Sequence, residues 1–108
     1  APPALSPLAE VQLVRIVQEA LTNVRKHAAA TTVCVELAVS DRRLHLRVVD
    51  DGVGFVLGNS SARSFGLATM KERAHSVDGE LSVTSAPGQG TAVMLTMRLL
   101  YEPERQEK

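Results

Sequence analysis

Hydrophobic side chains recur at helical spacing through the first third of the sequence. Residues 8–29 include neither glycine nor proline, and apolar residues return every three or four positions, as on one side of a helix. These positions are Leu13, Val14, Val17, Ala20, Leu21, Val24 and Ala28. Ser6 and Pro7 suit the N-cap and the first turn. The pattern predicts a long amphipathic helix over residues 8–29, with Ser6 as its cap.

Polar side chains fill the other side of the same helix. At about 100° per residue, several of them fall within a sector of roughly 120°: Gln12, Arg15, Glu19, Asn23, Lys26 and His27. Solvation is the ordinary explanation for charged residues on a helix face. Asn23 fits that explanation less well, because Asn is a mediocre helix former.

Apolar and polar residues alternate in four later segments, which is the pattern of half-buried strands. The segments are residues 32–39, 44–50, 80–86 and 91–99. The links SDRR and PGQG predict a tight turn within each pair. A second helical period covers residues 66–77 and stops at Asp78-Gly79. Residues 52–65 are too long for a plain connection and predict a lid or a disordered loop.

The order of elements is helix, two strands, loop, helix, two strands. Since each strand has one apolar face, one face of the sheet needs a cover of helices. We therefore expect an α/β (α+β) fold, a two-layer sandwich in which helices cover one face of a mixed, mostly antiparallel sheet. The chain has 108 residues, enough for one domain. We expect a linker at 1–7, the domain at 8–100 with a lid at about 55–65, and a tail at 101–108.

Composition and charge narrow the range of partners. The 12 basic and 12 acidic side chains cancel, so no overall field favours nucleic acid or an acidic membrane. No apolar stretch approaches the roughly 20 residues of a membrane span, and no secretory leader opens the sequence. Cys34 lies in an apolar run and is expected to be a buried thiol in a reducing compartment. We expect a cytoplasmic, monomeric fragment of a longer protein, whose membrane attachment stays open.

Several familiar motifs are missing from the sequence. It has no GxxxxGK followed by Ser or Thr, so a phosphate loop of that kind is excluded. A dinucleotide-binding GxGxxG would need glycine at the position of Leu57. Scattered histidines and a single cysteine give no zinc-binding spacing, and no GxSxG nucleophile turn occurs.

A group of separate segments suits a nucleotide instead. Asp50 ends a strand ahead of Gly52 and Gly54. Its carboxylate can accept a hydrogen bond from an exocyclic amine, and glycines let the backbone approach a flat base. Taken alone, a plain hairpin turn explains this stretch as well.

The first helix and the later turns add matching chemistry. Glu19 can accept a proton, Asn23 can offer an oxygen to Mg²⁺, and Lys26 can meet a phosphate. The segment SFGL starts a helix whose free N–H groups suit an anion. The segment GQGT adds a glycine turn and the hydroxyl of Thr91.

These segments together resemble the ATP-binding catalytic domain of bacterial sensor histidine kinases. The matching runs are RIVQEALTNVRKHA, VVDDGVGF, FGLATMKERA and GELSVTSAPGQGTAV. The first of these and GLxxMxERA are similar to the nitrate-sensor and DesK-type branch, which pairs with LuxR-type response regulators. The resemblance covers about residues 8–99. It implies the GHKL (Bergerat) ATP-binding fold shared with gyrase, Hsp90 and MutL.

The resemblance implies a role for each matching residue. Glu19 is implied as the catalytic acid that polarises the attacking group, and Asn23 as the Mg²⁺ ligand. Asp50 is implied to bind the adenine amine, and Asp51 is expected to be only a turn residue. The residues implied to hold ATP are Asn23, Lys26, His27, Asp50, Gly52, Gly54, Gly66, Leu67, Gly88, Gly90 and Thr91.

Some residues keep two explanations. His27 lines the sugar or base, or is merely favoured at a helix C-terminus. Arg73 is a structural ion-pair residue or a phosphate ligand. Arg63 and Ser64 stand where relatives often have an earlier glycine of the second glycine box, which leaves the phosphate grip open. Core positions are expected at Met70, Val77, Val83 and Leu95.

By the same resemblance, the domain binds Mg-ATP and passes the γ-phosphoryl group to a histidine on a separate dimerisation domain. A LuxR-type response regulator then receives it. No phosphoacceptor helix occurs within these 108 residues, so the fragment should bind nucleotide without phosphorylating itself. Two alternatives stay open: a GHKL anti-sigma-factor serine kinase or ATPase, and a degenerate module that only docks a protein.

Overall fold

A computed structural model describes residues 4–57 and 62–100, without the side chains of residues 62–65. Its elements are helix α1 (Pro7–Asn23), π-helix η1 (Val24–Ala28), strands β1 (Val33–Ser40) and β2 (Arg43–Asp50), helix α2 (Ala62–His75), and strands β3 (Glu80–Ser85) and β4 (Thr91–Arg98). This succession confirms the predicted order of helices and strands.

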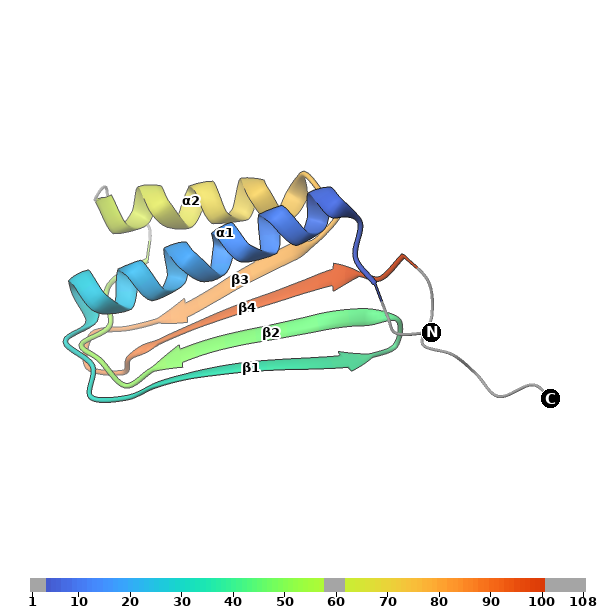
Figure 1. The fold of residues 1–108 in the computed structure, drawn as a ribbon. Coiled ribbons are helices and arrows are strands. Elements are labelled where there is room, and N and C mark those ends of the chain that lie inside the picture. Colours follow the sequence, from blue (N-terminus) through green and yellow to red (C-terminus); the bar gives the residue numbers. More distant parts are fainter. Residues whose placement is uncertain (1–3, 58–61, 101–108) are drawn as a thin grey trace.

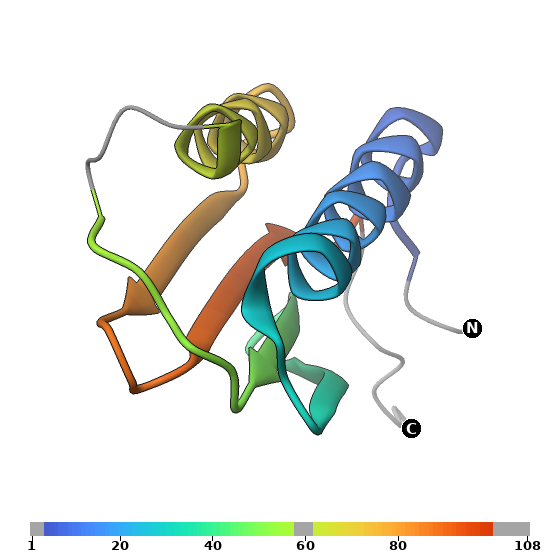
Figure 2. The same ribbon diagram turned by 90° about the vertical axis from the view of Figure 1, so that its left-hand side faces the viewer.

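The strands form one sheet in the order β1-β2-β4-β3. Both helices lie on the same face of that sheet (Figure 1). Viewed along the strands, α1 lies over β2 and β4, and α2 lies on the side of β3 (Figure 2). The two-layer α+β sandwich is therefore confirmed. Every pairing among the described strands is antiparallel. The expected antiparallel character is confirmed, but the described sheet has no parallel pair and is therefore not mixed.

Helix α1 starts as its sequence predicts and ends differently. The Oγ of Ser6 accepts a hydrogen bond from the amide of Ala9 at 3.1 Å. Pro7 occupies the first turn, where its missing N–H is not needed. The α-helix stops at Asn23, and the chain continues as the π-helix η1. Ala29 then turns the chain with φ = 50°.

The buried side of α1 is rotated from the predicted apolar side. Ala20 is buried as expected, but Val14 and Leu21 are 53% and 37% exposed. Ala9 and the fully buried Ile16, both outside the predicted set, take part in the core. The reason is that α1 packs against α2 on one flank as well as on the sheet below. The buried stripe therefore turns toward α2.

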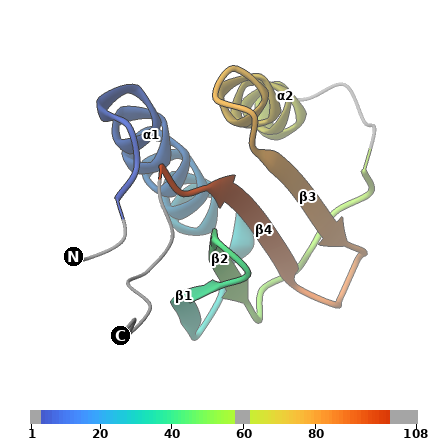
Figure 3. The ribbon, with the colours of Figure 1, turned by 90° about the vertical axis from the view of Figure 1, so that its right-hand side faces the viewer.

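Strand β1 is exposed along its whole length. Its large apolar residues pair in register with β2 on the helix-facing side, yet they are 42–60% exposed: Val33, Val35, Leu37 and Val39. No described helix extends over this edge of the sheet (Figures 2 and 3). Cys34, on the opposite side of the same strand, is also exposed. The prediction of a buried thiol is wrong because Cys34 lies on the face of the sheet that neither helix covers (Figure 1).

Helix α2 begins at Ala62, ahead of the predicted start at residue 66. The end of the expected lid, residues 62–65, is therefore helical, while residues 58–61 lie outside the described part of the chain. The predicted stop is confirmed, since the helix ends at His75 and Asp78 turns the chain with φ = 59°.

The core lies between the two helices and the middle strands. Its largest fully buried side chains are Ile16, Leu46, Met70, Leu95 and Met97. The predicted core residues Met70 and Leu95 are among them, and Val77 and Val83 pack against the cluster as partly buried side chains. Within residues 4–57 and 62–100, no helix has the length and apolar character needed to cross a membrane.

Candidate functional site

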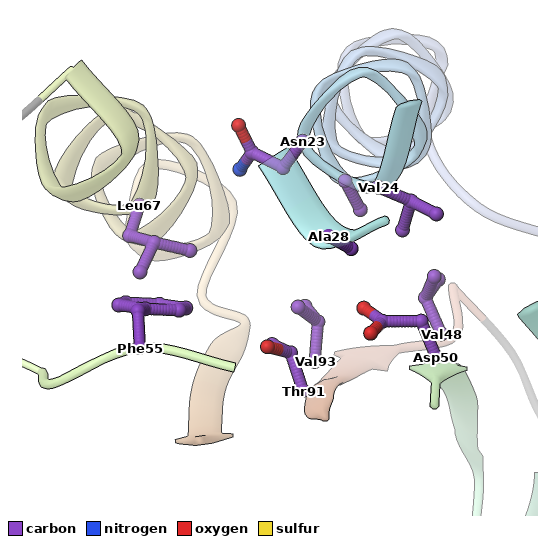
Figure 4. A pocket seen from close by; sticks show the side chains of 10 residues that line it. Asn23, Val24, Ala28, Val48, Asp50, Phe55, Leu67, Thr91 and Val93 are labelled. Carbon is purple, nitrogen blue, oxygen red and sulfur yellow. The ribbon is translucent and has the colours of Figure 1, made fainter. Parts of the chain in front are cut away.

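A pocket opens at the end of the sandwich where α1 passes into η1 and β2 ends (Figure 4). The side chains that line it come from both layers: Ala20, Asn23, Val24, Ala28, Val48, Asp50, Phe55, Leu67, Thr91 and Val93. An apolar wall that carries a few polar groups is typical of a small-molecule site. The fold thus brings Asn23, Asp50, Leu67 and Thr91, all predicted site residues, into one pocket wall.

Asp50 is a buried carboxylate in this wall, with 7% of its surface exposed. Its Oδ1 accepts a hydrogen bond from the amide of Gly52 at 2.8 Å. The carboxylate points into the pocket (Figure 4), and the bond from Gly52 leaves Oδ2 for another donor. A ligand that carries an amino group can supply that donor.

Three of the predicted glycines mark places where backbone segments pass close together. A Cβ at Gly52 would overlap the carbonyl oxygen of Ala28, and a Cβ at Gly90 would overlap that of Asp50. Gly54 is likewise pressed against backbone, with φ = 65°. These glycines are needed to close the chain around the pocket, and none of them is among the residues that line it.

The polar residues predicted on one face of the first helix differ in their position relative to the pocket. Asn23 lies at the rim between the two helices (Figure 4). Glu19, one turn earlier, is half-buried, and its carboxylate lies against Gly66 of α2. Lys26 and His27 belong to η1 and are not in the pocket wall, and Lys26 is exposed. Their roles therefore stay predictions.

Thr91 is held by a hydrogen-bond network. Its hydroxyl lies 2.9 Å from that of Ser85. The Ser85 hydroxyl also donates to the carbonyl of Gly90 at 3.0 Å and accepts from the amide of Phe55 at 3.0 Å. The network joins β3, β4 and the segment after β2. Gly88, in the same turn, lies outside the pocket wall.

The sequence-based site prediction missed Phe55 and Ser85, and apart from Leu67 it named none of the aliphatic residues that line the pocket. The ring of Phe55 stands opposite Leu67 in the pocket (Figure 4), and Ser85 fixes Phe55 and Thr91. Phe55 directly follows the glycines of VVDDGVGF, which is a signal for a pocket residue. Ser85 opens the segment SAPGQGT and bonds Gly90 and Thr91 within it, whereas its bond to Phe55 joins a segment 30 residues away.

Asp51 is exposed and fixes the turn before β1. Its carboxylate accepts hydrogen bonds from the amides of Thr31 at 2.9 Å and Thr32 at 3.0 Å, and from the Thr31 hydroxyl. These bonds lower the pKa of Asp51 from 3.8 to about 2, and the bond from the Thr31 hydroxyl has the largest effect. Asp51 does not line the pocket, which agrees with the turn role expected for it.

Arg73 links the two helices. Its Nη1 donates a hydrogen bond to Oε1 of Gln12 at 3.1 Å. This contact favours the structural explanation of Arg73 over the phosphate ligand.

The side chains around the pocket fit a metal ion that is coordinated mainly by a bound phosphate compound and not by the protein. The described residues contain no group of three or more His, Cys, Asp or Glu that could hold a metal ion. A magnesium ion bound mainly by phosphates and water needs few protein ligands. Asn23 offers one amide oxygen at the pocket rim.

Comparison with known proteins assigns the chain to a family. The family model described as histidine kinase-, DNA gyrase B-, and HSP90-like ATPase matches residues 9–101. Sensor histidine kinase LiaS of Bacillus subtilis (strain 168) is 41% identical over 99 residues, which are 92% of this chain and 28% of that protein. DegS, a signal transduction histidine-protein kinase/phosphatase of Brevibacillus brevis, is 37% identical over 86% of this chain and 24% of its own length. The chain spans about a quarter of the length of these curated relatives.

Solved structures have the same fold. The blue-light activated histidine kinase of Erythrobacter litoralis EL346 has a TM-score of 0.70 and 26% identity over 84% of this chain and 30% of its own. The histidine kinase AdeS of Acinetobacter baumannii has a TM-score of 0.70 over 84% of this chain and 47% of its own, and at 13% identity this shows the fold alone. The chain therefore belongs to the histidine kinase-, DNA gyrase B-, and HSP90-like ATPase family, as an ATPase domain of the sensor histidine kinase type.

Proposed function

We propose that the domain binds Mg-ATP in this pocket, with the adenine amine on Asp50. The observation that carries the proposal is the buried carboxylate in the wall of an otherwise mostly apolar pocket. With Oδ1 engaged by Gly52, Oδ2 can accept the hydrogen bond of an exocyclic amine. Apolar side chains such as Val48, Phe55 and Val93 would enclose the flat base.

The remaining predicted residues are proposed to contact the phosphates, the sugar or the base. Asn23 would hold Mg²⁺, which supplies charge neutralisation at the phosphates. Lys26 would meet a phosphate, His27 would line the sugar or base, and Thr91 would lie near the adenine. The glycines at positions 52, 54, 66, 88 and 90, with Leu67, would bring the backbone close to the nucleotide.

The proposed reaction is phosphoryl transfer to a histidine on a separate dimerisation domain. The histidine nitrogen attacks the γ-phosphorus, the bond from that phosphorus to the bridging oxygen breaks, and ADP leaves. Glu19 would polarise the attacking nitrogen, and the rest of the catalysis is positioning and charge neutralisation. A LuxR-type response regulator would receive the group next. We propose a cytoplasmic domain that is monomeric in isolation and contacts neither nucleic acid nor membrane.

Calorimetric titration of ATP with Mg²⁺ tests the proposal. Wild type is expected to bind, and Asp50→Ala is expected to lose at least about tenfold in affinity, since a hydrogen bond to a charged group contributes about 1.5–3 kcal/mol. Asp51→Ala is the matched control, because that carboxylate is adjacent in sequence and outside the pocket wall. Absence of binding by wild type would contradict the proposal and favour a module that only docks a protein.

A second experiment separates the histidine kinase from the serine kinase and the ATPase of the same family. Purified domain and labelled ATP are mixed with a histidine-bearing dimerisation domain or with a serine-bearing anti-sigma antagonist. Label is expected on the histidine domain alone. Transfer to the serine protein, or release of phosphate without transfer to either, would assign the other activity.

A further inference from the structure

Gly66 is an unusual residue for its place in α2. It is the fifth residue of Ala62–His75, and glycine is disfavoured inside helices relative to every residue except proline. Its φ is not in the left-handed region that requires glycine elsewhere in this chain. The backbone conformation therefore does not explain the glycine.

The space of a side chain at Gly66 is occupied by Glu19 of α1. A Cβ at Gly66 would overlap Oε2 of Glu19 and would lie 3.3 Å from its Cδ and 3.7 Å from its Cγ. Gly66 is buried and Glu19 is half-buried, so the carboxylate fills a gap between the two helices. Because Gly66 has no side chain, the Glu19 carboxylate can occupy this space.

Gly66 differs in this respect from the glycines that close the pocket. At Gly52, Gly54 and Gly90, the nearest atom to an added Cβ is a backbone carbonyl oxygen, which cannot move without a change in the fold. At Gly66 it is the end of a flexible side chain. Alanine at position 66 would therefore displace one carboxylate and leave the backbone in place.

We propose that Gly66 is a positioning residue for Glu19, because the missing side chain lets α2 fix where that carboxylate stands. The inference rests on the role proposed above for Glu19 in phosphoryl transfer. A general base must lie within hydrogen-bond reach of the proton it takes, so a displaced carboxylate slows the chemical step while nucleotide binding continues. Gly66 is also among the glycines proposed to lie close to the nucleotide, so the ATP affinity of Gly66→Ala is measured separately from its kcat.

The test is a double-mutant cycle of Gly66→Ala and Glu19→Gln, which isolates the coupling between two residues. Phosphotransfer from ATP to a supplied histidine-bearing domain gives kcat and KM, and calorimetry gives the ATP affinity. Ala68→Gly is the matched control, since it makes the reverse change at an exposed position of the same helix. The melting temperature is measured for each variant, and the Cδ resonance of Glu19 is measured by carbon NMR in each variant that keeps Glu19.

Gly66→Ala is expected to keep or raise the melting temperature and, at saturating ATP, to lower kcat about 10- to 100-fold. In the Glu19→Gln background the same change is expected to alter kcat less than about twofold. Equal losses in both backgrounds, or an unmoved Glu19 resonance in Gly66→Ala, would overturn the proposal. If wild type binds no ATP, the proposed function fails, while the resonance still reports whether Gly66 positions Glu19.

Discussion

The adjacent residues Asp50 and Asp51 differ in burial, partners and ionisation. Asp50 is buried in the pocket wall and accepts one amide bond from Gly52. Asp51 is exposed and accepts its bonds from Thr31 and Thr32. One carboxylate is thus available to a ligand, while the other fixes the entry into β1.

The lowered pKa of Asp51 predicts how stability depends on pH. In the folded chain this pKa is about 2, against the ordinary value of 3.8. A depressed folded-state pKa stabilises the fold above the ordinary value, and this stabilisation is lost as pH falls from 3.8 toward 2. Asp51→Asn is therefore expected to lower the melting temperature above about pH 4 and to converge with wild type near pH 2. Thermal unfolding of both proteins across this range is the measurement, and parallel curves would contradict it.

Two glycines with positive φ predict substitutions of different severity. Gly88 has φ = 79° and no heavy atom within 4 Å of an added Cβ, whereas Gly54 has φ = 65° and its Cβ would overlap the carbonyl oxygen of Ala86. Gly88→Ala is expected to lower the free energy of unfolding by only the left-handed penalty of about 1–2 kcal/mol. Gly54→Ala is expected to lower the free energy of unfolding clearly more, because the backbone at Ala86 must also move. Urea denaturation measures both, and equal losses would mean that the overlap is relieved cheaply.

At the scale of elements, α1 is defined by its cap at one end and by a change of helix type at the other. The cap bonds the amide of Ala9 to Ser6. At the far end, residues Val24–Ala28 are π-helical, which widens the last turn where the chain borders the pocket. Such turns occur often at functional sites. Their backbone arrangement brings Val24 and Ala28 into the pocket wall.

Removal of the cap predicts a measurable loss of stability. Ser6→Ala leaves the Ala9 amide without its side-chain acceptor and is expected to cost about 1 kcal/mol in free energy of unfolding. Ser6→Asp is the matched control, because Asp also caps and its charge suits a helix N-terminus. Urea denaturation of the three proteins is the measurement. An alanine variant as stable as wild type would show that the cap contributes nothing here.

For the whole molecule, the helix layer covers only part of the sheet. Large apolar side chains stay exposed on α1 and on the helix-facing side of β1: Leu8, Val11, Val14, Leu21, Val33, Val35, Leu37 and Val39. An extended apolar surface beside an edge strand favours aggregation.

Substitution on this surface is expected to improve solubility without loss of fold. Leu37 is 60% exposed at the edge, whereas Leu46, its register partner on β2, is 1% exposed. Leu37→Thr is expected to raise the concentration at which the isolated chain aggregates and to leave its melting temperature nearly unchanged. Leu46→Thr, the control, is expected to unfold at a clearly lower temperature. Light scattering and thermal unfolding give both readings, and an unchanged aggregation threshold for Leu37→Thr would contradict the prediction.

The sequence by itself determined the elements, and it singled out four residues that the fold brings into one pocket wall: Asn23, Asp50, Leu67 and Thr91. Capping residues, glycines and the two hydrophobic periods act through near neighbours, so the start of α1, the turn after β1 and the strands could be predicted. Asp50 could be singled out because a carboxylate before two glycines at a strand end is visible in a short segment.

Only the tertiary structure decided which residues are covered and which side chains meet. Val14 and Ile16 are equally apolar in the sequence, but the placement of α2 buries Ile16 and leaves Val14 exposed. Val33, Val35, Leu37 and Val39 are exposed because no described helix reaches β1, and Cys34 is exposed because it lies on the face opposite the helices. The contact of Glu19 with Gly66 joins residues 47 positions apart (66 − 19). Burial and such contacts depend on how distant elements pack, which a local periodicity does not record.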